Sequence, residues 1–186
     1  LSSYKGKTST SSPSPHEWEN AFGDAEVVFC ITITSTLSGT YNSAVIAKDI
    51  YEQNHAGRKV YVLDSLSTGP EIALFIEKIA ELIKVGFAPD DIYKTLLEYK
   101  DKTHLYFSLA SLNNFAKNGR ISPVIAAGIG LLGVRVVGKA SEEGTLLPLD
   151  KCRGEKRALK KLIDHLKECG YTDGKIFIAH NNNEAG

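Results

Sequence analysis

Strand-length apolar runs alternate with amphipathic segments through the first half of the chain. Residues 26–33 form a continuous β-branched and aromatic run, which is typical of a strand buried on both faces of a parallel sheet. Residues 41–53 then carry apolar side chains at helical spacing, and residues 60–63 predict a second short strand. Residues 70–84 and 90–99 predict two further helices. Strands that alternate with helices in this way predict right-handed βαβ units.

The pattern changes in the second half, where strands come closer together. Strands are predicted at residues 105–109, 134–140, 146–149 and 175–179, with helices at residues 112–117, 124–132 and 155–169. We therefore expect an α/β fold of two domains with a ligand cleft between them. Residues 1–118 form the parallel-sheet βαβ domain in this prediction, and residues 119–186 form a mixed-sheet α+β domain.

Composition and charge exclude several classes of protein. The 186 residues include 22 basic and 22 acidic side chains, so there is no excess of positive charge. This argues against a nucleic-acid partner and against a DNA-associated regulator. The apolar runs are far shorter than the roughly 20 residues that span a bilayer. We expect a cytoplasmic protein without stable membrane insertion. A chain of this length buries about two-thirds of its unfolded surface, so its core requires neither disulfides nor a metal.

Cysteine and methionine usage add two expectations. Cys30, Cys152 and Cys169 lie far apart without a CxxC pair, which favours buried reduced thiols over a disulfide framework or a zinc site. The chain contains no methionine, although methionine is a normal residue of protein cores. Either the chain is an internal piece of a longer protein, or modified methionines are missing from the sequence.

Two glycine patterns between Gly128 and Lys139 resemble nucleotide-binding motifs. Residues 128–133 match GxGxxG, but a predicted helix precedes them and a predicted strand follows, which reverses the required context. Residues 133–139 match GxxxxGK, but Ala140 stands where a P-loop has serine or threonine. A nucleotide-dependent transferase that uses this segment is the alternative function. The histidines show no shared spacing, and we expect His165 on the surface of its helix.

Two hydroxyl-rich loops carry the stronger signal. The first hydroxyl loop (residues 10–14) precedes a predicted helix at residues 15–21, and the second hydroxyl loop (residues 34–40) follows the carboxyl end of a buried strand. Neither loop contains a cation, so hydroxyls and helix N-terminal amides suit a singly charged carboxylate better than a polyphosphate. The other interpretation is that these residues only cap their helices.

The same loops resemble motifs of the DegV family. Residues 10–15 (TSSPSP) are similar to its TSxPS motif, and residues 33–44 (ITSTLSGTYNSA) are similar to its LSGTYxSA motif. Further similarities are residues 62–69 (VLDSLSTG), 118–122 (NGRIS) and 151–154 (KCRG). Their order and approximate spacing agree over almost the whole chain.

The resemblance implies a fatty-acid carrier rather than an enzyme, with no catalytic residue, cofactor or metal. It implies a long-chain fatty acid whose tail is buried between the domains and whose carboxylate is held by Thr10, Ser38 and Gly39. It also implies a separate fatty-acid kinase that phosphorylates the carboxylate, with Arg120 on the kinase-facing surface. Members of the family have an additional strand at the start and a further stretch with a histidine at the end, so we expect the second domain to be incomplete.

Overall fold

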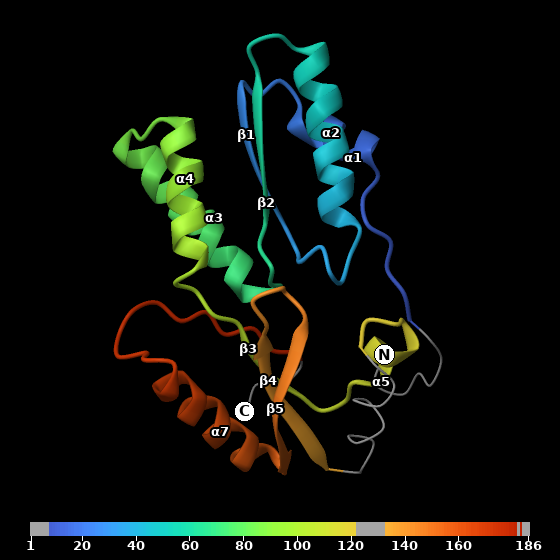
Figure 1. Ribbon diagram of the computed structural model, residues 1–186, viewed down its shortest axis with the longest axis vertical. Coiled ribbons are helices and arrows are strands. Elements are labelled where there is room, and N and C mark those ends of the chain that lie inside the picture. The colour runs from blue at the N-terminus through green and yellow to red at the C-terminus, as the bar shows by residue number, and fades with distance from the viewer. Residues whose placement is uncertain (1–7, 122–132, 182, 184–186) are drawn as a thin grey trace.

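The computed structural model describes residues 8–121, 133–181 and 183 (Figure 1). Its first half is built on two parallel strands, β1 (Val27–Thr32) and β2 (Lys59–Asp64), joined by helix α2 (Thr40–Asn54). In register, Val28 faces Val60 and Thr32 faces Asp64, so both strands end at the same edge of the sheet. The predicted βαβ unit is therefore confirmed.

Helices cover both faces of this sheet (Figure 1). Helices α1 (Pro15–Phe22) and α2 pack on one face, around a core that includes Cys30, Ala44, Ala47, Tyr51 and Val60. Helices α3 (Pro70–Val85) and α4 (Pro89–Lys100) pack on the other face, around Leu63, Phe75, Ile79, Leu82 and Leu96. β1 contributes side chains to both cores, which is why its sequence is a continuous apolar run rather than an alternating one.

The helix ends follow from local sequence. Ser14 caps α1 through a capping box, in which the Glu17 amide donates to the Ser14 hydroxyl and the Glu17 carboxylate accepts from the Ser14 amide. Helix α3 ends at Gly86, whose left-handed conformation (φ 92°) allows its amide to bond the last carbonyls of the helix. Both ends lie within one residue of those that the sequence predicts.

The second half is built on an antiparallel sheet in the order β3-β4-β5. Its strands are β3 (Tyr106–Leu109), β4 (Val134–Ala140) and β5 (Leu146–Arg153), and the helices α5 (Asn113–Lys117) and α7 (Glu155–Glu168) lie beside them. Val137 and Cys152 pack under α7, whereas Val136 packs with Leu112 on the α5 side. The α/β fold class is confirmed. The domain boundary after residue 118 stays a prediction. β3, which comes before that boundary in the sequence, pairs with β4, which comes after it.

Three expectations about the second half have other outcomes. Residues 175–179 are not a strand: no described strand pairs with them, and Ile178 is 84% exposed. β5 runs four residues beyond the predicted end at Leu149, because residues 150–153 pair with β4. The helix predicted at residues 124–132 lies outside the described residues. Among the described residues, no helix combines the length and the apolar composition needed to cross a membrane.

Candidate functional site

The candidate site lies at the edge of the first sheet where both parallel strands end. The second hydroxyl loop leaves β1 here and is tied to the loop that follows β2. The Thr34 amide donates to the Ser67 carbonyl at 2.8 Å, and the Ser35 amide donates to a carboxylate oxygen of Asp64 at 3.1 Å. Asp64 also accepts the Leu66 amide at 3.1 Å. The start of the loop is therefore held by the end of β2 and by the loop that follows β2.

Ser38 and Gly39 stand at the N-terminus of α2. Gly39 is the N-cap and has no side chain that could cap the first-turn amides of the helix. The Ser38 and Thr40 hydroxyls lie 2.7 Å apart, and the Thr40 amide donates to the Ser38 hydroxyl at 3.3 Å. Ser38 is half-buried and Gly39 is exposed. A carboxylate at this position would meet a hydroxyl donor together with the positive end of the helix dipole.

The first hydroxyl loop approaches the same helix end. The Ser43 hydroxyl, in the first turn of α2, donates to the Pro13 carbonyl at 2.6 Å. A Cβ atom added to Gly39 would lie 3.6 Å from the Ser12 hydroxyl. The structure thus brings the two predicted loops together, although they lie on different segments. Thr10 is exposed, and no hydrogen bond of its side chain occurs within the described part of the chain.

Helix α5 and the residue after it bind the segment that precedes the first hydroxyl loop. The Thr8 hydroxyl bonds the Asn114 side-chain oxygen at 2.9 Å, and the Asn118 side-chain amide donates to the Thr8 carbonyl at 2.8 Å. Arg120 follows two residues later, and its amide donates to the Phe115 carbonyl at 2.9 Å. Arg120 therefore lies two residues after Asn118, which bonds the segment that leads to Thr10.

Two carboxylates border the hydroxyl loops: Asp64 accepts the Ser35 amide, and Glu17 bonds Ser14. Neither hydroxyl loop contains a charged side chain. The segments that end β1 and follow β2 bury the hydroxyl residues Thr32, Thr34, Ser65 and Ser67, and the acidic residue Glu71 is buried in the first turn of α3. The Ser67 hydroxyl is fully buried and has no hydrogen-bond partner among the described residues. Over that part of the chain there is also no group of three side chains suited to hold a metal ion. The arrangement is chemically suited to accept hydrogen bonds from, or donate them to, one small polar group.

The hairpin of the second sheet contributes one contact that the sequence patterns do not indicate. The Thr36 hydroxyl donates to the carbonyl of Gly144, at the tip of the β4–β5 hairpin, over 2.7 Å. In the sequence, Gly144 lies between the strands predicted at residues 134–140 and 146–149. The signal that a sequence carries for such a contact is weak, because a turn glycine has the same local pattern whether or not its tip touches another segment.

Comparison with known proteins identifies the relatives of this chain. The family model described as "Uncharacterised protein, DegV family" matches residues 3–186. The chain belongs to the DegV family. A DegV domain-containing protein of Streptococcus pneumoniae is 45% identical over 172 residues, which cover 92% of this chain and 61% of that protein. This DegV chain therefore spans about three-fifths of the length of that relative.

Two solved structures resemble the fold, and each is loaded with a fatty acid. A DegV family protein from Eubacterium eligens, loaded with heptadecanoic acid, has a TM-score of 0.95 and 43% identity, covering 99% of this chain and 67% of that one. The Fatty Acid Kinase (Fak) B3 protein of Streptococcus pneumoniae, loaded with linoleic acid, has a TM-score of 0.84 and 45% identity. That match covers 87% of this chain and 57% of the Streptococcus protein.

The alternative nucleotide site does not have the required geometry in this DegV chain. Residues 134–139, which contain most of the GxxxxGK pattern, form the antiparallel strand β4. A P-loop instead connects a strand to a helix and cradles phosphate with its amides. Residues 128–132 of the GxGxxG pattern lie outside the described residues.

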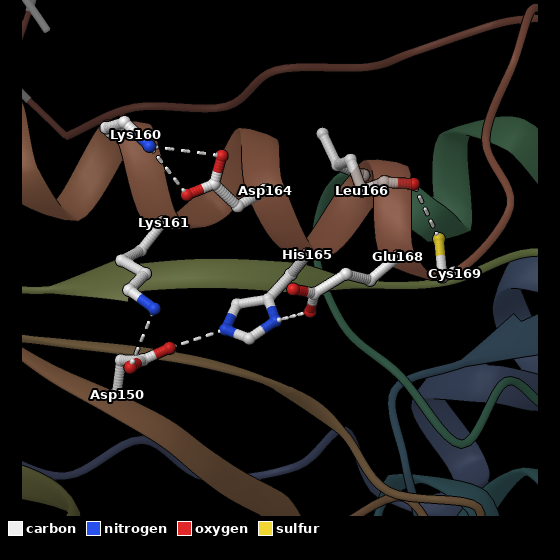
Figure 2. Close-up of polar contacts among 8 residues, drawn as sticks. All are labelled: Asp150, Lys160, Lys161, Asp164, His165, Leu166, Glu168 and Cys169. Carbon is white, nitrogen blue, oxygen red and sulfur yellow. Dashed lines mark hydrogen bonds and ion pairs between the residues drawn. The ribbon is translucent and has the colours of Figure 1, made fainter.

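His165 is partly exposed on α7, and its ring also bonds two carboxylates. Its Nε2 lies 2.6 Å from Asp150 and its Nδ1 lies 2.9 Å from Glu168, so it joins β5 to α7 (Figure 2). Lys161 lies 3.5 Å from the other oxygen of Asp150. The hydrogen bond with Asp150 raises the pKa of His165, and the same bond lowers the pKa of Asp150. We call these four side chains the ionic cluster.

Two of the three cysteines are buried, as expected. Burial raises the pKa of Cys30 to about 12, so its thiol stays protonated and unreactive. Cys152 lies under α7. Cys169 departs from the expectation, because it is exposed just after α7, where its thiol donates to the Leu166 carbonyl.

Proposed function

We propose that this chain binds a long-chain fatty acid and holds its carboxylate at the N-terminus of α2. The observation that carries the proposal is the meeting of the two hydroxyl loops, with Ser12 beside Gly39 and Ser43 bonded to Pro13. Ser38, Gly39 and Thr10 are the proposed carboxylate ligands. The heptadecanoic acid and the linoleic acid bound in the two similar structures support the choice of ligand class.

The charge of the site favours a carboxylate over a phosphate. A fatty acid carries one negative charge, which hydroxyl and amide donors can satisfy, whereas a polyphosphate calls for cations that both loops lack. Burial of the acyl tail supplies most of the affinity at about 0.8 kcal/mol per methylene, offset by the ordering of the chain. The hydroxyls would then determine where the head group lies. We place the tail between the two domains.

We also propose a fatty-acid kinase as the partner, with Arg120 at the contact. The resemblance to a Fatty Acid Kinase B3 protein supports this partner class. Arg120 is half-buried and close in sequence to Asn118, which bonds the segment before Thr10. In this proposal the chain is a carrier, and the phosphoryl transfer takes place on the kinase.

Mass spectrometry of solvent extracts and titration with oleate test the proposal together. The purified protein should release a fatty acid, and the double variant Thr10→Val with Ser38→Ala should bind oleate about a hundredfold more weakly. Each lost hydrogen bond to a charged group removes about 1.5–3 kcal/mol. Thr95→Val is the matched control, because its hydroxyl bonds a carbonyl in α4, far along the chain.

Arg120→Ala separates lipid binding from partner contact. Oleate affinity should stay unchanged, while acyl-phosphate formation with ATP and a fatty-acid kinase should fall. An extract without fatty acid, combined with no thermal shift on adding oleate or palmitate, would overturn the proposed function.

A further inference from the structure

The tip of the β4–β5 hairpin (residues 141–145) reaches the second hydroxyl loop, although it belongs to the other sheet. Figure 1 shows this hairpin pointing toward the edge where β1 and β2 end. Gly144 is buried at the tip and has a φ of 77°. A Cβ atom there would lie 2.9 Å from Leu66 Cα and closer still to the Thr34 hydroxyl. Only glycine therefore fits, on grounds of both conformation and space.

The hydrogen bonds at the tip have one possible direction. Thr36 has a single hydroxyl proton, and it donates this proton to the Gly144 carbonyl at 2.7 Å. The hydroxyls of Thr34 and Thr36 lie 2.9 Å apart, so Thr34 must be the donor in that pair. Thr34 is only 1% exposed. A chain of hydroxyls thus runs from the buried start of the loop to a carbonyl of the second sheet.

The series of hydrogen-bonded hydroxyls ends at Thr36, two residues before Ser38. The backbone anchors of the loop, at Thr34 and Ser35, come from the loop that follows β2 and from the end of β2. Beyond them, the Leu37 amide bonds the Thr34 carbonyl within the loop, and Ser38 bonds only Thr40 among the described residues. The Gly144 carbonyl, which bonds the Thr36 hydroxyl, is therefore the contact nearest to Ser38 that comes from outside the first sheet and its loops.

We propose that Thr36 and Gly144 are positioning residues for the head-group site. The Gly144 carbonyl holds Thr36, which sets the path of the chain into Ser38 and Gly39 and so the direction of their donors. The inference rests on the proposed function. It predicts that the second sheet contributes to recognition of the carboxylate itself, and not only to burial of the tail.

Paired ligands and paired variants test this role. Dissociation constants of oleate and of oleyl alcohol are measured for the wild-type chain, Thr36→Val, Thr36→Ser and Thr95→Val, with the melting temperature of each. Thr36→Val, which keeps the shape but removes the hydroxyl, should weaken oleate binding about tenfold, as expected for one hydrogen bond. Oleyl alcohol, which shares the tail but lacks the carboxylate, should bind within about twofold of wild type.

The conservative variants make the outcome specific. Thr36→Ser should restore oleate binding because it restores the donor, and Thr95→Val should bind both ligands like wild type because its lost hydroxyl bond lies in α4. Thr36→Ala is the second variant and should show the same loss for oleate alone if Thr36→Val does not fold.

Two results would overturn the inference. One is unchanged oleate affinity in Thr36→Val, and the other is an equal loss for both ligands, which would indicate a general structural role. A wild-type chain that binds neither ligand would instead contradict the proposed function, and the inference with it.

Discussion

Two polar regions of this molecule, the second hydroxyl loop and the ionic cluster, differ in charge and in burial. The second hydroxyl loop and its anchors use hydroxyls, amides and carbonyls, and Thr34 and Ser67 are each no more than 2% exposed. The ionic cluster uses charged groups that remain near water, with side chains exposed by 18% at His165 and 27% at Asp150 (Figure 2). Neutral groups can be buried at small cost once they are hydrogen-bonded, whereas buried charges are expensive. The neutral region can therefore hold a defined geometry inside the protein.

The same difference separates their response to pH. Hydroxyls and backbone groups of the loop do not titrate near neutrality, and the Asp64 carboxylate that borders it accepts two amides. The ionic cluster depends on the protonation of His165. Substitutions in the hydroxyl region should therefore have large effects that are independent of pH, and those in the ionic cluster should have small effects that depend on it.

The largest effect is expected at Gly144. Gly144→Ala should lower the free energy of unfolding by about 3 kcal/mol, from an unfavourable positive φ and from overlap with Leu66 and Thr34. Gly86→Ala is the control, because its φ is also positive, at 92°, but the space around it is open. It should cost only about 1 kcal/mol. Urea denaturation measures both, and equal losses would show that the hairpin tip is not closely packed against the loops.

A smaller effect is expected where the two hydroxyl loops meet. Ser43→Ala removes the donor to the Pro13 carbonyl and should cost about 1 kcal/mol in the free energy of unfolding, at every pH between about 6 and 9. Thr95→Val, which removes a hydroxyl bond on the surface of α4, should cost less. Urea denaturation of both variants checks the order. A cost for Ser43→Ala no greater than that of Thr95→Val would mean that the first loop is not held by this bond.

The smallest effect is expected at His165, and it should change with pH. Both ring nitrogens bond carboxylates, so the cationic form is favoured and its pKa lies above the ordinary value of 6.5. Its contribution to stability is complete below pH 6.5 and is lost as the pH rises through the raised pKa. The loss should be less than about 1 kcal/mol, because the pair is partly exposed.

Asp150 has the opposite dependence. Its pKa is lowered from 3.8, so its contribution is present above pH 3.8 and is lost as the pH falls through the lowered pKa. The cluster is therefore most stabilising between about pH 4 and 6.5. Urea denaturation of wild type and His165→Gln across pH 5–9 should show the difference between them shrinking as the pH rises. A constant difference would contradict this assignment.

The elements of the fold were largely predictable from the sequence. The capping box at Ser14 and Glu17, the αL glycine at Gly86 and the bounds of β4 all follow from local patterns, because propensity, capping and periodicity act over a few neighbouring residues. The run at residues 175–179 shows where this fails. An apolar alternating segment becomes a strand only if a partner satisfies its backbone, and no described strand does.

The candidate site was predictable in its residues but not in its assembly. The hydroxyl loops and the lack of cations could be read directly, and they indicated a neutral site for one small anion. The partners of His165 were not predictable, because helical periodicity does not show which acids on β5 lie opposite it. Asp150 is 15 residues away in sequence, across the turn from β5 to α7.

The sequence by itself determined the helices and strands, the neutral chemistry of the two loops and membership of the DegV family. The tertiary structure alone decided that Ser12 lies beside Gly39, and that Thr36 bonds the Gly144 carbonyl across 108 residues. The reason is physical. Local patterns specify how each segment satisfies its own backbone, whereas a contact between distant segments depends on how two independently formed sheets pack.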